Sequence, residues 1–163
     1  MAYVIRPIQT EERAALAAFM RTHWGDDSVV VHETVYHPST LPGFLALDGT
    51  TWVGVVTYHL ADDQCEIVTL DSLRAGEGIG TALVAAVREV AQRAGCRRLW
   101  LITTNDNLTA LRFYQKRGFV LKALYPEAVT RARRIKPQIP QVGENGIPIR
   151  DEIELEMRLE TPS

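Results

Sequence analysis

One stretch of the sequence carries most of the information about the fold: Leu70-Asp-Ser-Leu-Arg-Ala-Gly-Glu-Gly-Ile-Gly-Thr-Ala-Leu83. Three glycines, Gly76, Gly78 and Gly80, stand at alternate positions where a strand gives way to a helix. Glycine lets the backbone approach a ligand closely, and the first amides of a helix have no partner within it. Such a turn binds anions, above all phosphate groups. We therefore expect a phosphate cradle here rather than an ordinary strand-to-helix turn.

The segments on both sides of this turn alternate between strand and helix patterns. Apolar residues at helical spacing predict a helix from Ile79 to Ala94, and Asn107 is well placed to cap a second helix that ends at Gly118. Strand patterns cover the ranges 3–8, 44–47, 52–58, 66–70, 99–104, 119–124 and 149–159. This order predicts an α/β domain with a mixed sheet.

Two segments fit this pattern less well. Residues 26–42 are mostly turn-forming residues around Val29–Val31, and we expect a loop or a broken helix there. Residues 126–148 are rich in proline, and we expect a short helix over 127–135 followed by a long ordered loop. In the alternating strand that follows, Asp151 falls on the apolar face, where a carboxylate is costly unless it is paired. A structural role for Asp151, tying down the preceding loop, is favoured over a contact with substrate.

Composition excludes several classes of protein. The 163 residues suit one domain, and a net charge of −2 argues against a domain-wide basic surface for nucleic acid or anionic lipid. Residues 1–10 lack the pattern of a secretory signal, and no apolar run is long enough to cross a membrane. We expect a cytoplasmic protein that binds neither nucleic acid nor membrane. Cys65 and Cys96 are expected to be buried free thiols.

The glycine turn does not match two common phosphate-binding motifs. A dinucleotide fold needs a third glycine, but Thr81 or Leu83 occupies that position, depending on which glycine starts the count. A P-loop needs a lysine at its close, and no lysine is near. A zinc site is also rejected, since the spacing of His32-Glu33-x-x-x-His37 is one residue too long for two ligands on one helix face. We expect no metal.

Two signatures in the chain resemble those of the GNAT superfamily of acetyl-CoA-dependent N-acetyltransferases. Gly78 and Gly80 match the end of (Gln/Arg)-x-x-Gly-x-(Gly/Ala), although Ala75 stands at the opening position. The second is Asn107-x-x-Ala110-x-x-x-Tyr114-x-x-x-Gly118-Phe119. The resemblance implies one three-layer domain over residues 1–163, with a mixed sheet of about six or seven strands flanked by helices and residues 126–148 as a subfamily feature.

The resemblance also implies where acetyl-CoA binds. In the family, backbone amides of the glycine turn hold the pyrophosphate, and an amide near Leu70 binds the thioester carbonyl. The cofactor-binding residues implied by this resemblance are Leu70, Ser72, Ala75, Gly76, Glu77, Gly78, Ile79, Gly80, Thr81 and Asn107.

The chemistry of acetyl transfer needs a base for the amine and an acid for the departing thiolate. Glu66 is the candidate base, on a strand face expected to be shared with Val68 and Leu70, where partial burial would raise its pKa. Asp71 is the next candidate, and a water chain is the third. By resemblance Tyr114 supplies the proton to sulfur.

The acceptor is expected to be an amine on a small molecule or a peptide. Its pocket would be shaped by His32, Glu33 and Tyr36, which lie where acceptor loops of the family lie. Two other functions stay open: a non-catalytic acyl-CoA sensor and, less favoured, a protein-binding module with a coincidental glycine turn. The C-terminal strand, 149–159, could pair across a homodimer, although nothing in the sequence requires it.

Overall fold

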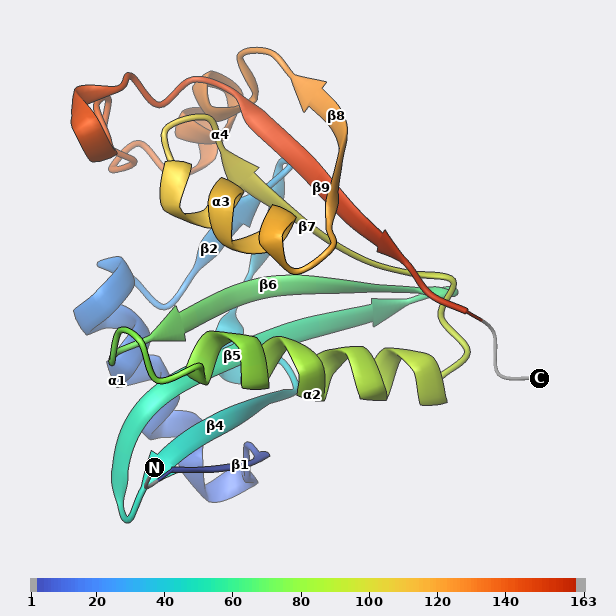
Figure 1. Cartoon of the computed structure of the whole chain (residues 1–163). Helices are drawn as coiled ribbons and strands as arrows, with labels where there is room; N and C mark the ends of the chain where they lie inside the picture. The colour runs from blue at the N-terminus through green and yellow to red at the C-terminus, as the bar shows by residue number, and fades with distance from the viewer. Residues whose placement is uncertain (1–2, 161–163) are drawn as a thin grey trace.

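The computed structural model describes residues 3–160, which form a seven-stranded mixed sheet and a small separate hairpin. The strand order in the large sheet is β1-β4-β5-β6-β7-β9-β8 (Figure 1). The α-helices are α1 (Arg13–Trp24), α2 (Ile79–Arg93), α3 (Leu108–Lys116) and α4 (Ala128–Ile135). The strands are β1 (Val4–Pro7), β2 (Val29–Val31), β3 (Thr34–Tyr36), β4 (Gly43–Asp48), β5 (Thr51–Ala61), β6 (Gln64–Ser72), β7 (Arg98–Thr104), β8 (Val120–Tyr125) and β9 (Glu152–Arg158). The expected α/β fold is confirmed.

The two faces of the sheet are covered by different elements. In Figure 1, α2 and α3 lie in front of the sheet, and α1 and β2 lie behind it. Helix α2 buries Ile79, Leu83, Val87 and Ala91 at helical spacing, and these side chains belong to one apolar cluster with the front of the sheet. A second cluster joins α1 and β2 to the back of the sheet through Leu16, Met20, Val29 and Val31.

Strands β6 and β7 separate along their length, and this separation positions the site. They pair as parallel strands only from Gln64–Ile67 against Arg98–Leu101. Beyond Ile67, β6 stays paired with β5 alone, while β7 continues beside β9. The two strands diverge visibly in Figure 1. At the same point β6 has a β-bulge, since Ile67 and Thr69 face consecutive residues of β5 and Val68 has no partner.

The last strand is internal to the sheet. Strand β9 pairs with β7 on one side and with β8 on the other, so both of its edges are occupied. Strand β9 therefore has no free edge through which a homodimer could pair, and a homodimer as such stays a prediction. The internal position also buries three charged residues of the strand, Glu152, Glu154 and Glu156. Asp151, just before the strand, accepts the amide of Glu127 at 2.9 Å and so ties down the start of α4.

Residues 26–42 correct a second expectation. Instead of a loop or a broken helix, they form the hairpin β2–β3 and a short 3-10 helix. The turn of the hairpin is made by His32 and Glu33, which both have positive φ, at 50° and 64°. This conformation is typical of glycine or asparagine, so neither residue gives the usual sequence signal of a hairpin.

Three local predictions, for Asn107, Gly95 and the two cysteines, are confirmed. The side chain of Asn107 caps α3 by accepting the amide of Ala110 at 3.1 Å. Gly95, with φ 76°, follows the end of α2. Cys65 and Cys96 are buried free thiols. Within residues 3–160, no helix combines the length and the apolar character that crossing a membrane demands.

Candidate active site

The glycine turn between β6 and α2 has the geometry of an anion cradle. Gly76 and Gly78 have φ of 78° and 75°, and Gly78 is the N-cap of α2. The amide of Leu73 donates to Val53 and that of Ala82 donates to Gly78. Between them, the loop amides of residues 74–78 donate to no described backbone group, and those of the first helical turn have no helical partner. A row of free N–H groups thus meets the positive end of the α2 dipole.

Gly80 is required for the packing of α2 against α3 rather than for a turn conformation. A Cβ at this position would lie 3.2 Å from the ring of Phe113, so glycine lets α2 approach α3 closely. Next to it, Arg117 donates to the hydroxyl of Thr81 at 3.0 Å, and its guanidinium lies over the Phe113 ring. Arg117 therefore places a positive charge beside the cradle. Sequence reasoning missed this residue, because it lies 36 positions away from Thr81.

A narrow slot opens where β6 and β7 separate. Its volume is about 100 Å³, and its walls are Ile67, Val68, Leu70, Leu101, Ile102, Thr103, Asn107, Ala110, Tyr114 and Trp24. The slot contains three sequence-predicted residues: Leu70, Asn107 and Tyr114. The other predicted cofactor residues lie in the glycine turn, except for Ser72, which ends β6.

The hydroxyl of Tyr114 has no hydrogen-bond partner among residues 3–160. Tyr114 is 6% exposed, and no described side-chain polar atom that is sealed from solvent lacks a partner. The hydroxyl therefore opens into the slot that the residue lines. Burial raises the pKa of Tyr114 above its usual range, and the charge of Asp71 raises it further. At neutral pH this tyrosine is a proton donor.

Asp71 lies on β6 close to the slot and faces α1. The indole nitrogen of Trp24 donates to both of its carboxylate oxygens, at 3.1 and 3.0 Å. Burial raises the pKa of Asp71, while the bond from Trp24 lowers it. Trp24 also lines the slot, so Asp71 lies close to the slot. Both carboxylate oxygens of Asp71, however, already accept a hydrogen bond from Trp24.

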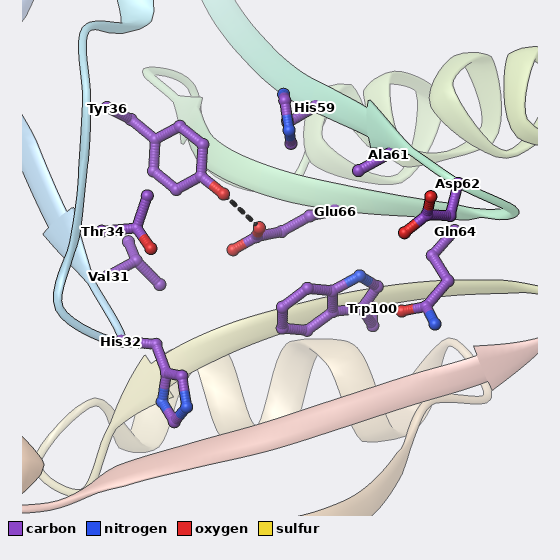
Figure 2. Close-up of a pocket in the computed structure, with 10 residues that line it drawn as sticks. All are labelled: Val31, His32, Thr34, Tyr36, His59, Ala61, Asp62, Gln64, Glu66 and Trp100. Carbon is purple, nitrogen blue, oxygen red and sulfur yellow. Dashed lines mark hydrogen bonds between the residues drawn. The ribbon is translucent and has the colours of Figure 1, made fainter.

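The structure corrects the expected orientation of Glu66. Glu66 and Leu70 were expected to share a face of β6, but the bulge at Val68 interrupts the alternation. Leu70 packs with the cluster under α2, whereas Glu66 points to the opposite face and accepts the hydroxyl of Tyr36 at 2.7 Å (Figure 2). Glu66 is 4% exposed, and burial raises its pKa, although the bond from Tyr36 acts in the opposite direction.

Glu66 lies in the wall of a cavity of about 410 Å³ on this back face of the sheet, which we call the Glu66 cavity. Its other lining residues come from the hairpin, from β5, β6 and the turn between them, and from β7: Val31, His32, Thr34, Tyr36, His59, Ala61, Asp62, Gln64 and Trp100 (Figure 2). His32 and Tyr36 were expected near an acceptor. Glu33 lies outside the cavity, where it pairs with Arg131 of α4.

A larger cavity of about 560 Å³, the apolar cavity, lies between α1, β2 and α4. Its walls include Val30, Val129, Ala132, Ile139 and Ile149. The two charged side chains that line it are already engaged. Glu152 accepts the backbone amide of His32 at 3.0 Å, with the imidazole Nδ1 3.3 Å from its other oxygen, and Lys136 donates to the carbonyl of Ser28 at 2.7 Å.

The β2–β3 hairpin contributes to both cavities. Val29 and Val30 line the apolar cavity, whereas Val31 and His32 line the Glu66 cavity. The hairpin is held to β9 by the contacts of His32 with Glu152 and to α4 by the pair of Glu33 with Arg131. Among residues 3–160, no three or more His, Cys, Asp or Glu side chains lie together in a way that could hold a metal ion.

Comparison with known proteins agrees with this geometry. The model of the acetyltransferase (GNAT) family matches residues 9–119, which is more than half of the chain. The chain therefore belongs to the GNAT acetyltransferase family, and the resemblance seen in its two signatures is confirmed.

Three relatives illustrate the match. The Bacillus subtilis (strain 168) protein YdhI, itself uncharacterized, is 44% identical over 92% of this chain and 94% of its own. The structure called IAA acetyltransferase from Bacillus cereus ATCC 14579 has 24% identity, a TM-score of 0.68 and coverage of 96% of this chain and 99% of that one. A GNAT family acetyltransferase from Elizabethkingia anophelis with acetyl-CoA bound has 21% identity, a TM-score of 0.67 and coverage of 97% and 99%. At these identities the two structures support the fold alone.

Proposed function

We propose that the protein is a cytoplasmic, acetyl-CoA-dependent N-acetyltransferase whose single domain spans residues 1–163 and transfers an acetyl group directly to a primary amine. The observation that carries this proposal is the unpartnered Tyr114 hydroxyl in a slot lined by β6, the same strand that leads into the turn of free amides. A proton donor beside a strand that ends in an anion-binding turn fits a diphosphate-bearing thioester. The acetyl-CoA bound to the relative from Elizabethkingia anophelis supports the same ligand.

The backbone of the glycine turn would hold the pyrophosphate of acetyl-CoA. Residues from Ala75 through Gly76, Glu77, Gly78, Ile79 and Gly80 to Thr81 offer amides, and Arg117 adds a positive charge. Because the amides are fixed before binding, little reorganisation is needed. The slot beside Leu70 and Asn107 would take the thioester, and Ser72 flanks the path between slot and cradle.

Glu66 would act as the base, directly or through water. An alkyl amine is mostly protonated at neutral pH and must lose a proton before its nitrogen attacks the thioester carbon. Glu66 directly precedes Ile67 in β6, and Ile67 lines the slot. Its buried carboxylate, with a raised pKa, is a stronger base than an exposed glutamate. Asp71 is the rival base, but both of its oxygens already accept Trp24.

Tyr114 would protonate the leaving sulfur. When the tetrahedral intermediate collapses, the carbon–sulfur bond breaks and the thiolate takes the phenolic proton, which solvent later restores. The neutral form of Tyr114 that this step requires is the form that its raised pKa favours. Thiolate is already a fair leaving group, so we expect this proton to accelerate the reaction toward the low end of the range of general acids, about 10²-fold.

The test combines calorimetry with coenzyme A and turnover of acetyl-CoA on a panel of primary amines. We expect heat of binding for the wild-type protein, and a fall in kcat of about 10²-fold for Tyr114→Phe and for Glu66→Gln with binding retained. Tyr58→Phe and Glu33→Gln are matched controls, because neither residue lines the slot or the Glu66 cavity. Absence of heat with coenzyme A would overturn the proposal. Heat without turnover on any amine would instead show an acyl-CoA sensor.

A further inference from the structure

One carboxylate oxygen of Glu66 is free. The Oε1 atom accepts the Tyr36 hydroxyl, and the other oxygen has no partner among residues 3–160. Since no sealed polar side-chain atom in this part of the chain lacks a partner, the second oxygen opens into the Glu66 cavity. Leaving a buried carboxylate partly unsatisfied is costly, so this geometry indicates a ligand that donates hydrogen bonds or carries positive charge.

The walls of the cavity suit a cation. Trp100, Tyr36 and His59 present aromatic rings, and no lysine or arginine lines the cavity. The guanidinium of Arg98, which Glu154 and Glu156 hold at 2.7 and 3.0 Å, already lies over one face of the Trp100 ring, 4.7 Å from its centroid. Aromatic faces together with an unneutralised carboxylate are the chemistry that recognises organic ammonium groups. The apolar cavity contrasts with this, because Glu152 and Lys136 already have partners.

A second carboxylate stands at the outer end of the same cavity. Asp62 lies in the β5–β6 turn, and Figure 2 shows its carboxylate directed toward the side of the cavity where Glu66 lies, with Gln64 and Trp100 below the two carboxylates in this view. Asp62 lies in the turn before β6, whose first residue is Gln64, and a strand rises about 3.3 Å per residue, so Asp62 lies on the order of 10 Å from Glu66. From the cradle back along the chain, the order is therefore slot residues of β6, Glu66 and Asp62.

We propose that the acceptor is a linear α,ω-diamine or a polyamine, whose reacting amine lies between the slot and Glu66 and whose second ammonium lies among Trp100, His59 and Asp62. This inference rests on the proposed function. The buried carboxylate takes the proton of the amine that reacts, and the exposed carboxylate holds the charge that stays. A monoamine fills only the inner half of this cavity and leaves Asp62 without a partner.

The experiment measures acetylation of diamines from 1,3-diaminopropane to 1,8-diaminooctane, with the monoamines n-butylamine and n-hexylamine for comparison. We expect kcat/KM to pass through a maximum within the diamine series and to exceed the monoamine values there. We also expect this advantage to shrink as salt is added, because it is partly a charge interaction at an exposed site. Diamines no better than monoamines at any length would overturn the inference.

Asp62→Asn tests the second ammonium site. The residue has φ 56°, a conformation that asparagine accepts, so the turn is retained. We expect the ratio of kcat/KM for diamine to that for monoamine to fall about threefold to tenfold. Asp63→Asn is the matched control: it removes the same charge from the same turn, but Asp63 pairs with Arg97 outside the cavity. An equal fall in both variants would overturn the assignment of Asp62.

The experimental outcomes that would overturn the diamine inference differ from those that would overturn the proposed function. If coenzyme A binds and 2-phenylethylamine is acetylated better than every diamine, the enzyme is an N-acetyltransferase whose acceptor enters the apolar cavity, and the diamine proposal falls alone. If coenzyme A gives no heat of binding, the proposed function falls and the diamine proposal falls with it.

Discussion

The candidate binding sites on the front and the back of the sheet are built from different parts of the chain. On the front, the cradle is built almost wholly from consecutive backbone amides of one turn, 74–81, and one helix start. On the back, the Glu66 cavity is built from side chains of the hairpin, of the three strands β5, β6 and β7, and of one turn. If the proposed function holds, the difference teaches that the cofactor is recognised by backbone geometry, whereas the acceptor is recognised by side chains that can change one at a time.

The largest effect is expected on the front, from Gly78→Val. Gly78 has φ 75°, which a β-branched residue adopts only with strain, so the substitution displaces the first amides of α2. Calorimetry should show at least a tenfold loss of affinity for coenzyme A, about 1.4 kcal/mol. Gly95→Val is the matched control, because Gly95 has φ 76° at the other end of the same helix. If both variants lose the same affinity, the effect is helix stability and the cradle is not the binding site.

A smaller effect is expected on the back, from Tyr36→Phe. The Tyr36 hydroxyl lowers the pKa of Glu66 against the rise that burial causes, so removing it lets the pKa rise further. The acidic limb of the kcat/KM profile should move to higher pH, with a loss of several-fold on that limb. Tyr125→Phe removes a similar hydroxyl from Glu154, at 2.6 Å, and should shift the limb much less. A limb that stays in place for Tyr36→Phe would show that Glu66 is not the base.

The pH dependence of folding stability should differ between Glu66 and Glu154, which lie on the same face of the sheet. The pKa of Glu66 is raised by burial, so its contribution to stability falls as pH rises through that pKa. Glu66→Gln should therefore melt higher than wild type at pH 8, and this gain should vanish toward pH 4. Each kcal/mol corresponds to about 2–4 °C in a domain of this size. A thermal melt at several pH values measures it.

The control in this experiment is Glu154→Gln, which is expected to change the stability in the opposite direction. Burial pushes the pKa of Glu154 up, but hydrogen bonds from Tyr125 and Arg98 outweigh burial and lower it overall. Its stabilising contribution is present above the ordinary pKa of glutamate and is lost as pH falls through the lowered value. Glu154→Gln should thus melt lower than wild type at pH 8, with the gap closing in acid. The same sign for both variants would contradict the charge assignment of the back face.

The smallest effect is expected in the apolar cavity. Ala132 is 2% exposed and lines that cavity, so Ala132→Leu fills part of its volume. We expect kcat/KM for the best diamine to stay within about twofold of wild type, as for a substitution away from the site. A large loss, measured with the same diamine and with unchanged coenzyme A affinity, would show that the acceptor uses the apolar cavity.

The sequence predicts the front site better than the back site. The front site is built from one local segment, whereas the back site is built from side chains that only the fold brings together. The cradle could be read because alternate glycines before a helix are a local signal, and Asn107 and Tyr114 follow within one motif. The orientation of Glu66 could not, since the bulge at Val68 becomes visible only through the register with β5. The hairpin was missed because His32 and Glu33 take positive φ without glycine or asparagine. Asp62 and Trp100 carry no local signal that would bring them to Glu66.

The internal position of β9 has a consequence for how the chain is made. Strand β9 follows β8 in the sequence but lies between β7 and β8, so β8 has no partner in the sheet until β9 has been synthesised. Until β9 has formed, the edge of β7 that faces away from β6 also stays open, along Arg98–Thr104. Chains cut short before Glu152 would leave this edge and β8 unpaired and would be targets for proteolysis.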